Sequence, residues 1–312
     1  MSNSNQKKIC ILSAAFNENV NLAYFYNNVK KVIELLPYDF EIMLVDDGSS
    51  DGTLEIIKDI AQKDALVKYI SLAQNCGQQV ALKAGIDHIN ADAIIMMDCD
   101  MQHPPEFIPN LIETWLKTGA NVVNTIREED YELSWFKRIT SKYFYKALNL
   151  ISDIKLEAGQ ADFRLIDQSI TKNLKKVNRK DIFLRGMINR IECKKILINY
   201  SPQKRYAGTT KYTFPKMLKL ALSGITSFSN KPLYTIIYTG FFIAFLSLLY
   251  LPYVIVTEIN GNAVSGWGSL LMSVAFFGGF NLVILGIYGI YIGKILFRDN
   301  DIPLYEIDDK NY

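Results

Sequence analysis

Two long stretches without a charged side chain divide this 312-residue sequence. No charged residue occurs at positions 232–257, and beyond Glu258 none occurs at positions 259–293. Each stretch is long enough to cross a hydrocarbon core of about 30 Å as a helix. The sequence therefore predicts two transmembrane helices, at about 233–257 and 268–293, attached to a globular domain. The alternative is a pair of buried helices in a soluble core.

The charges that flank these stretches predict an orientation. Basic residues precede the first stretch and follow the second, whereas the short loop between them contains no Lys or Arg; the flanking residues are Lys216, Lys219, Lys231, Lys294 and Arg298. By the positive-inside rule, both ends of the hairpin face the cytoplasm. We therefore expect a multi-pass protein of the cytoplasmic (inner) membrane with both termini in the cytoplasm. The expected parts are a globular domain at 1–212, an interfacial helix and linker at 213–231, a transmembrane hairpin at 232–298 and a cytoplasmic tail at 299–312.

The globular part alternates apolar strand-like runs with helical segments. The strand candidates lie at 8–14, 41–45, 67–72, 94–97 and 121–126. This alternation predicts an α/β domain whose mostly parallel sheet is covered by helices on both faces. The turns after these strands contain neither a dinucleotide-binding fingerprint nor a P-loop, which argues against those two enzyme classes.

Acidic residues follow two of the predicted strands directly. Asp98, Asp100 and Gln102 occupy alternate positions just after the fourth strand, and Asp46 and Asp47 follow the second. Open α/β sheets bind ligands at the carboxyl ends of their strands, and Mg²⁺ prefers carboxylate and phosphate oxygens. The first group is a candidate metal and diphosphate site, and the second a candidate ribose or base site. Helix caps and solvated turns remain alternatives for both.

Four motifs together carry a resemblance to a known family. They are AAFNEN at 14–19, VDDGSSDGT at 45–53, NCGQQVALKAG at 75–85 and MDCDMQHPPE at 97–106. This set resembles the nucleotide-binding half of inverting family 2 glycosyltransferases with the GT-A fold. Three later segments resemble the polyprenyl-phosphate branch, which includes bactoprenol glucosyltransferases and dolichyl-phosphate mannose synthases; they lie at 161–167, 183–187 and 204–233. The resemblance implies a Rossmann-like GT-A catalytic domain, interfacial amphipathic helices and a C-terminal transmembrane hairpin.

The resemblance also implies roles for individual residues. Asp100 and Gln102 would coordinate Mg²⁺ or Mn²⁺ with the donor diphosphate, Asp98 would lie beside the ribose and sugar, and Asp162 would face the reacting sugar. Pairing with Arg164, or capping of the next helix, is the alternative for Asp162. The nucleoside would be held by Ala15, Phe16, Glu18, Asp46 and Asp47. The acceptor phosphate would be bound by Arg127, Arg138, Ser141, Arg205 and Lys211.

The expected acceptor simplifies the chemistry. A lipid phosphate has a pKa of about 6, so it is largely dianionic at cytoplasmic pH and requires no general base. The site must instead supply cations that orient this anion next to the donor diphosphate. Segments 134–151 and 212–228 carry apolar residues at helical spacing together with basic residues, as expected of helices in the headgroup plane. Packing on the catalytic core is the alternative.

The resemblance implies inverting transfer of a hexose, with glucose from UDP-glucose expected, to undecaprenyl phosphate for modification of a surface glycan such as lipopolysaccharide or a cell-wall polymer. Mannose, galactose, an amino sugar and aminoarabinose are alternatives. The expected partners are a nucleotide sugar, the lipid and the membrane, with no nucleic acid. We also expect a homo-oligomer such as a tetramer.

Two other functions are considered as rivals. One rival is a processive polysaccharide synthase, which usually carries a Q-x-x-R-W motif that is absent here. The other is a noncatalytic nucleotide-sugar-binding scaffold. His103 lies beside the expected metal ligands, but the resemblance does not assign it a catalytic role.

Overall fold

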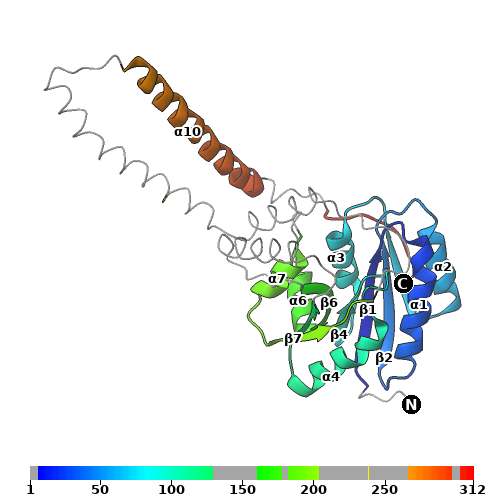
Figure 1. Ribbon diagram of the computed structural model, residues 1–312. Helices are drawn as coiled ribbons and strands as arrows, with labels where there is room; N and C mark the ends of the chain where they lie inside the picture. The colour runs from blue at the N-terminus through cyan, green and yellow to red at the C-terminus, as the bar shows by residue number, and fades with distance from the viewer. Residues whose placement is uncertain (1–5, 129–159, 178–181, 204–237, 239–265, 297–302) are drawn as a thin grey trace. The chain divides into compact units, whose positions relative to one another are not determined.

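A computed structural model describes residues 6–128, 160–177, 182–203, 238, 266–296 and 303–312 (Figure 1). The chain divides into two compact units. The first contains all the strands and includes the C-terminal segment Ile302–Tyr312, and the second includes Leu218–Asp301.

The first unit is built around one mixed β-sheet. Its strands lie in the order β7-β5-β6-β4-β1-β2-β3-β8. Their bounds are Lys8–Ala15 (β1), Asp39–Asp46 (β2), Val67–Leu72 (β3), Ala93–Met96 (β4), Val122–Arg127 (β5), Gln160–Asp167 (β6), Lys195–Tyr200 (β7) and Ile307–Lys310 (β8). The central strands β3, β2, β1 and β4 are parallel, whereas β6 pairs antiparallel with both β4 and β5, and β8 pairs antiparallel with β3. The predicted mostly parallel α/β sheet is therefore confirmed for its centre.

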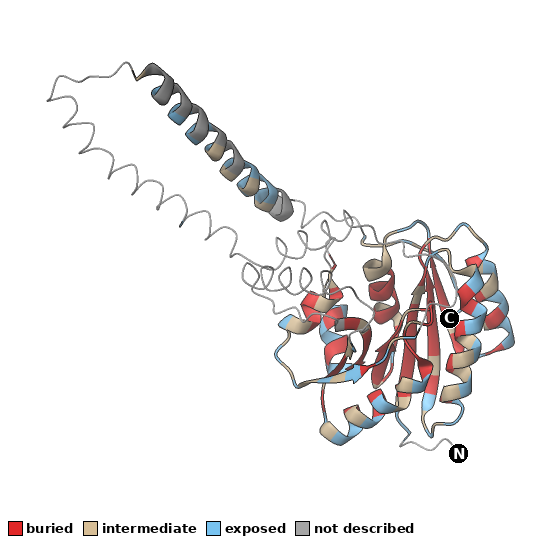
Figure 2. Cartoon of the chain, viewed as in Figure 1, coloured by how far each residue is buried: buried red, intermediate tan, exposed pale blue. Residues whose placement is uncertain are grey.

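Helices cover both faces of this sheet. Their bounds are Asn19–Ile33 (α1), Thr53–Lys63 (α2), Gln78–His88 (α3), Ile108–Thr118 (α4), Gln168–Lys175 (α6) and Leu184–Arg190 (α7), and the short 3-10 turn Pro105–Phe107 precedes α4. Helices α1, α2 and α4 contribute to one apolar core with alternate residues of the strands, such as Ile9 and Ile11. Helix α3 packs on β1 and β2. The strands between the helices are buried along almost their whole length (Figure 2), as expected for a sheet covered on both sides.

Gly85 allows α3 to approach the sheet closely. A Cβ atom on this residue would lie 2.3 Å from Leu12 Cδ1 and 3.1 Å from Val45 Cγ2. Helix propensity alone favours Ala over Gly by about 1 kcal/mol. We expect Gly85→Ala nevertheless to destabilise the protein, by about 1–3 kcal/mol, because the methyl group overpacks the interface. Thermal unfolding of the variant checks the sign, and a rise in the midpoint would contradict the close approach.

Part of the segment 299–312, which the sequence predicts to be a tail, forms the edge strand β8. Ile307–Lys310 pairs with β3, and its side chains alternate between half-buried and exposed. The strand is short and carries three consecutive charged residues, which is typical of protected sheet edges. In sequence, such a charged segment resembles a solvated tail. Its pairing with β3, which the sequence does not reveal, identifies it as a strand.

The described part of the second unit is mainly helix α10, Trp267–Leu296, which includes the second predicted membrane span. Among the residues that the structure describes in full, none of the helices has the length and apolar character of a membrane span. The first predicted span and the predicted amphipathic helices at 134–151 and 212–228 lie outside the described residues, Tyr238 excepted.

Candidate active site

The first two motifs form one structural piece at the carboxyl ends of β1 and β2. The backbone N–H of Asn17 donates to Ser49 Oγ at 3.0 Å, and the N–H of Ser50 donates back to Asn17 Oδ1 at 2.9 Å. The Glu18 N–H donates to Thr53 Oγ1 at 2.9 Å. Asn17 has a positive φ of 54°, a conformation that asparagine tolerates better than most residues. The reciprocal bonds therefore explain why the two turns keep fixed positions.

Asp47 fastens the third motif to the second. Its buried carboxylate accepts hydrogen bonds from Asn75 Nδ2 at 2.9 Å, from the Cys76 N–H at 2.8 Å and from the Gly77 N–H at 2.9 Å. Burial raises the pKa of Asp47 from its ordinary value, although the two backbone donors oppose this effect. These contacts give Asp47 a positioning role. Its predicted contact with the nucleoside stays a prediction.

Asp46 differs from its neighbour in how its two oxygens are used. Oδ2 accepts from the Ser49 N–H and from Ser71 Oγ, both at 3.3 Å. Oδ1 is buried and has no hydrogen-bond partner among the described residues. Because an unpaired buried acceptor costs about 1–3 kcal/mol, a ligand hydroxyl or N–H placed there would recover that free energy. Asp46 therefore fits the predicted ribose or base site.

The other predicted nucleoside residues lie at the end of β1 and in the turn that follows it. The Ala15 carbonyl accepts from the Asp47 N–H at 2.9 Å, which joins the ends of β1 and β2. Glu18 Oε2 accepts from Asn21 Nδ2 at 2.6 Å at the start of α1. The Phe16 ring is 37% exposed. The structure thus brings all five predicted nucleoside residues to one edge of the sheet.

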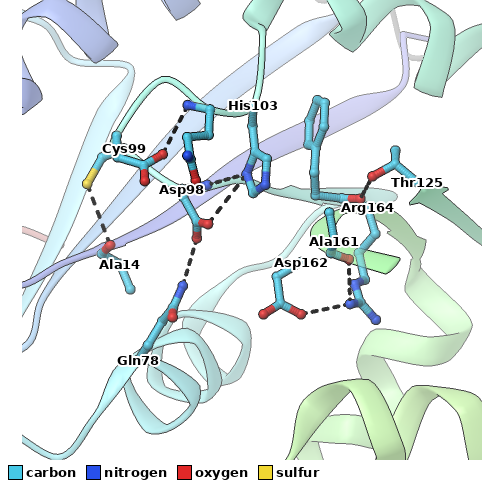
Figure 3. Close-up of polar contacts among 12 residues, drawn as sticks. Ala14, Gln78, Asp98, Cys99, His103, Thr125, Ala161, Asp162 and Arg164 are labelled. Carbon is cyan, nitrogen blue, oxygen red and sulfur yellow. Dashed lines mark hydrogen bonds and ion pairs between the residues drawn. The ribbon is translucent and has the colours of Figure 1, made fainter. Parts of the chain in front are cut away.

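The predicted metal-binding turn follows β4 and is held from two sides. Asp98 Oδ1 accepts from Gln78 Nε2 of α3 at 2.7 Å (Figure 3), so the third motif also contacts the fourth. Asp100 Oδ1 accepts from the Gln102 N–H at 3.0 Å, which closes a local turn in which Met101 has a φ of 67°. The turn is therefore fixed by side chains as well as by backbone.

His103 supports this turn from inside the core, a role that the sequence did not predict. Its ring is fully buried and stacks on Phe163 at a centroid distance of 5.0 Å, and Nδ1 accepts the Asp98 N–H at 2.9 Å (Figure 3). Burial, with a further contribution from Arg127, lowers the pKa of His103 to about 3. His103 is thus neutral, and its 3.7 Å approach to Asp98 Oδ2 is no ion pair at neutral pH. Phe163 is distant in sequence, so the contact depends on the tertiary fold.

Replacing His103 with phenylalanine tests this support. The variant keeps an aromatic ring to stack on Phe163 but leaves the Asp98 N–H without its acceptor, so we expect a loss of about 1–3 kcal/mol in the free energy of unfolding. Chemical denaturation measures the change. His88→Phe is a control, because among the described residues the hydrogen bond it loses is to the Ala84 carbonyl of its own helix and phenylalanine keeps a ring beside Tyr305 and Tyr312. Equal stability of the His103 variant and the wild type would contradict the supporting role.

Asp162 forms an ion-pair cluster with the buried Arg164 and the half-buried Arg185. Its Oδ1 lies 2.8 Å from Arg164 Nη2 and 3.2 Å from Arg185 Nη2 (Figure 3 shows the first pair). Burial acts to raise the pKa of Asp162, but Arg185 and Arg164 outweigh it and lower that pKa below its ordinary value. Pairing with Arg164, one of the two sequence-based alternatives, is therefore what the structure shows. Arg185 lies in the 183–187 motif and was not singled out from sequence.

Arg164 is the most unusual member of the cluster. It is 1% exposed, and its Nε and Nη1 have no hydrogen-bond partner in the described part of the chain. Burial lowers its pKa to about 10, so it remains charged at neutral pH. Asp162 is consequently the carboxylate that offsets the cost of this buried charge.

One predicted phosphate-binding residue adjoins the metal turn. Arg127, at the end of β5, donates through Nε to the Tyr200 hydroxyl at 3.1 Å and through Nη2 to Gln102 Oε1 at 3.4 Å. The structure thus places a predicted acceptor cation beside a predicted metal ligand. The other four predicted acceptor residues lie outside the described residues: Arg138, Ser141, Arg205 and Lys211.

The donor set of the turn suits a cation shared with a substrate. Among the described residues, no group of three or more His, Cys, Asp or Glu side chains could hold a metal ion by itself. Mg²⁺, however, is commonly bound by one or two carboxylates, with water and substrate phosphates completing the shell. The Asp98 and Asp100 carboxylates and the Gln102 amide are oxygen donors of that kind. The residues therefore fit an open site that a diphosphate would complete.

Comparisons with known proteins agree with this geometry. Residues 10–175 match the family model described as glycosyl transferase family 2. A bactoprenol glucosyl transferase of Shigella phage SfV is 39% identical over 97% of this chain and 99% of the relative. A prophage bactoprenol glucosyl transferase homolog of Escherichia coli K12 is 39% identical over 96% of this chain and 98% of its own length. The crystal structure of mannosyl-3-phosphoglycerate synthase from Rubrobacter xylanophilus has a TM-score of 0.52, with 13% identity and 75% of each chain covered, which supports the fold alone.

Proposed function

The chain belongs to glycosyl transferase family 2, and from that membership we propose that it transfers glucose from UDP-glucose to undecaprenyl phosphate with inversion. The observation that carries the proposal is 39% identity to bactoprenol glucosyl transferases over nearly the whole of both chains. The fold supports it, since four motifs converge on one edge of the sheet. The product is a lipid-linked glucose for modification of a surface glycan.

Different residues of the candidate site bind the donor and the acceptor. Asp46 and the turn at 15–18 hold the nucleoside, while Asp98, Asp100 and Gln102 face the diphosphate. A bound Mg²⁺ or Mn²⁺ supplies charge neutralisation for the leaving diphosphate. Arg127 lies close enough to Gln102 to orient a second anion at the same place. Because the lipid phosphate arrives already charged, these carboxylates need not abstract a proton.

We also propose that the second unit anchors the enzyme in the cytoplasmic membrane as a two-helix hairpin at 232–298. Two uncharged stretches in the sequence support this arrangement. The chain leaves the first unit after β7 and returns to it at β8, so any segment between them crosses a membrane an even number of times. Both ends of such a hairpin lie on the side of the catalytic domain, which the basic flanks place in the cytoplasm. A homo-oligomer is part of the same proposal.

Transfer of radiolabelled glucose tests the proposed reaction. Membranes containing the full chain are incubated with labelled UDP-glucose and undecaprenyl phosphate, with Mg²⁺ or with a chelator. We expect a labelled, organic-soluble lipid only when metal and lipid phosphate are both present. Parallel reactions with UDP-galactose, GDP-mannose and UDP-N-acetylglucosamine test the alternative sugars. Preferential transfer of another sugar would overturn the choice of glucose, and binding without transfer of any sugar would favour a noncatalytic scaffold.

A further inference from the structure

Residues 303–312 lie beside β3, the strand that leads into the third motif. In sequence they follow the anchor region that ends with helix α10, yet they belong to the first unit. Strand β8 pairs with β3 through Ile70 with Lys310, Ser71 with Asp309 and Leu72 with Ile307. Strand β3 is the one whose end leads into the third motif. The segment 303–312 is called the C-terminal clasp below.

Side chains hold the clasp in one register. Asn311 binds the β3 backbone twice, accepting from the Tyr69 N–H at 2.8 Å and donating to the Val67 carbonyl at 3.0 Å. Asp309 accepts from the Tyr69 hydroxyl at 3.0 Å and pairs with Lys58 Nζ at 2.7 Å. Asn311 thus extends the ladder beyond the last paired residues. This is a specific docking arrangement, not a chance contact of a polar tail.

The clasp contacts the elements that hold both acidic motifs. The Ala73 N–H donates to the Glu306 carbonyl at 3.0 Å, directly before the loop whose amides bind Asp47. The Tyr305 hydroxyl donates to Asp87 Oδ2 at 3.0 Å, on the helix whose first residue, Gln78, binds Asp98. Asp87 also receives the buried ammonium of Lys83, so its position is defined from two sides. One segment therefore braces the start of the third motif and the helix that follows it.

We propose that the C-terminal clasp is a positioning element of the donor site, which orders the third motif so that Asp47 and Asp98 are held for nucleotide-sugar binding. The donor's identity rests on the proposed function. Without the clasp, the edge of β3 is unpaired and the loop after it loses its anchor at Ala73. The loop then has to be ordered by the ligand, at the expense of donor affinity. Arg127, the described residue predicted to bind the acceptor phosphate, lies at the end of β5, which is separated from β3 by β6, β4, β1 and β2.

Deletion of residues 303–312 from the full chain tests the proposal. We expect the KM for UDP-glucose and the Kd for UDP to rise by about tenfold or more, while the KM for undecaprenyl phosphate and kcat at saturating donor stay within about threefold of wild type. Adding a synthetic peptide of residues 303–312 restores donor affinity. An intact, folded deletion variant with unchanged affinity for UDP would overturn the proposal.

Point variants decide the question if the deletion fails to fold. Asn311→Ala removes both backbone contacts, and Tyr305→Phe removes only the hydroxyl that binds Asp87. Each is expected to weaken UDP binding, measured by calorimetry, with kcat preserved. Asp308→Ala is the matched control, because this residue is exposed on the same strand. Equal UDP affinity in all three variants would refute the positioning role of the clasp. A wild-type enzyme that binds UDP but transfers no glucose would contradict the proposed reaction alone.

Discussion

Replacing Asp100 with alanine is expected to abolish glucose transfer, by at least about 10³-fold, and to leave the sheet folded. Asp100 lies in a turn outside the strands, where its Oδ1 accepts from the Gln102 N–H, so its loss leaves the apolar core intact. It does remove a carboxylate from the turn that we propose faces the leaving diphosphate. The rate of formation of labelled lipid, measured at saturating donor and metal, gives the size of the effect.

Mn²⁺ binding in the presence of UDP supplies a readout that does not depend on turnover. Electron paramagnetic resonance should show tight, UDP-dependent Mn²⁺ binding in the wild type and none in Asp100→Ala. Asp59→Ala is the matched control, since Asp59 is an exposed carboxylate on α2 that pairs with Lys63. An Asp100→Ala enzyme with full activity and normal Mn²⁺ binding would refute the metal assignment.

Asp162→Asn is expected to destabilise the protein by about 3–5 kcal/mol, because the fully buried Arg164 then keeps its charge without a carboxylate. Chemical denaturation of the solubilised full chain measures the change. The double variant Asp162→Asn/Arg164→Met should recover part of the loss, since it removes the buried charge together with its partner. Additive losses in the double variant would show that the pair is not coupled.

The same cluster gives a pH dependence whose sign follows from the pKa of Asp162. This pKa is lower in the folded protein than its ordinary value of about 3.9. The stabilisation is therefore fully present above that ordinary pKa and is lost as the pH falls through the folded value. As the pH is lowered below about 4, we expect the denaturation midpoint of the wild type to decrease. The midpoint of Asp162→Asn should decrease less steeply over the same pH range. Parallel acid-dependent profiles would contradict this assignment.

The sequence predicted the features that depend on local pattern. Continuous apolar runs ending in turns indicated the central parallel strands, because a strand buried on both faces has no polar alternation. Asp46, Asp98 and Asp100 were found for a related reason, since the carboxyl end of such a strand is where a polar side chain can face a ligand. The spacing of the four motifs indicated the resemblance to family 2 glycosyltransferases.

The features that the sequence did not predict depend on contacts between distant segments. His103 supports Asp98 only because Phe163 provides a stacking surface, and nothing near position 103 indicates that ring. Arg185 binds Asp162 although it lies 23 positions later in the sequence, beyond helix α6. The charged segment Ile307–Lys310 resembles a tail unless the free edge of β3 is known to lie beside it. In each case, the tertiary fold determines which partner is available.

The position of β8 after α10 in the sequence sets the order in which the sheet can be completed. A polypeptide emerges from the ribosome with its N-terminal part first, so β3 is made early and waits for its neighbour. That neighbour follows α10 in the sequence. The edge of β3 therefore stays unpaired until α10 has been synthesised. Completion of the sheet beside the third motif is thus coupled to synthesis of α10.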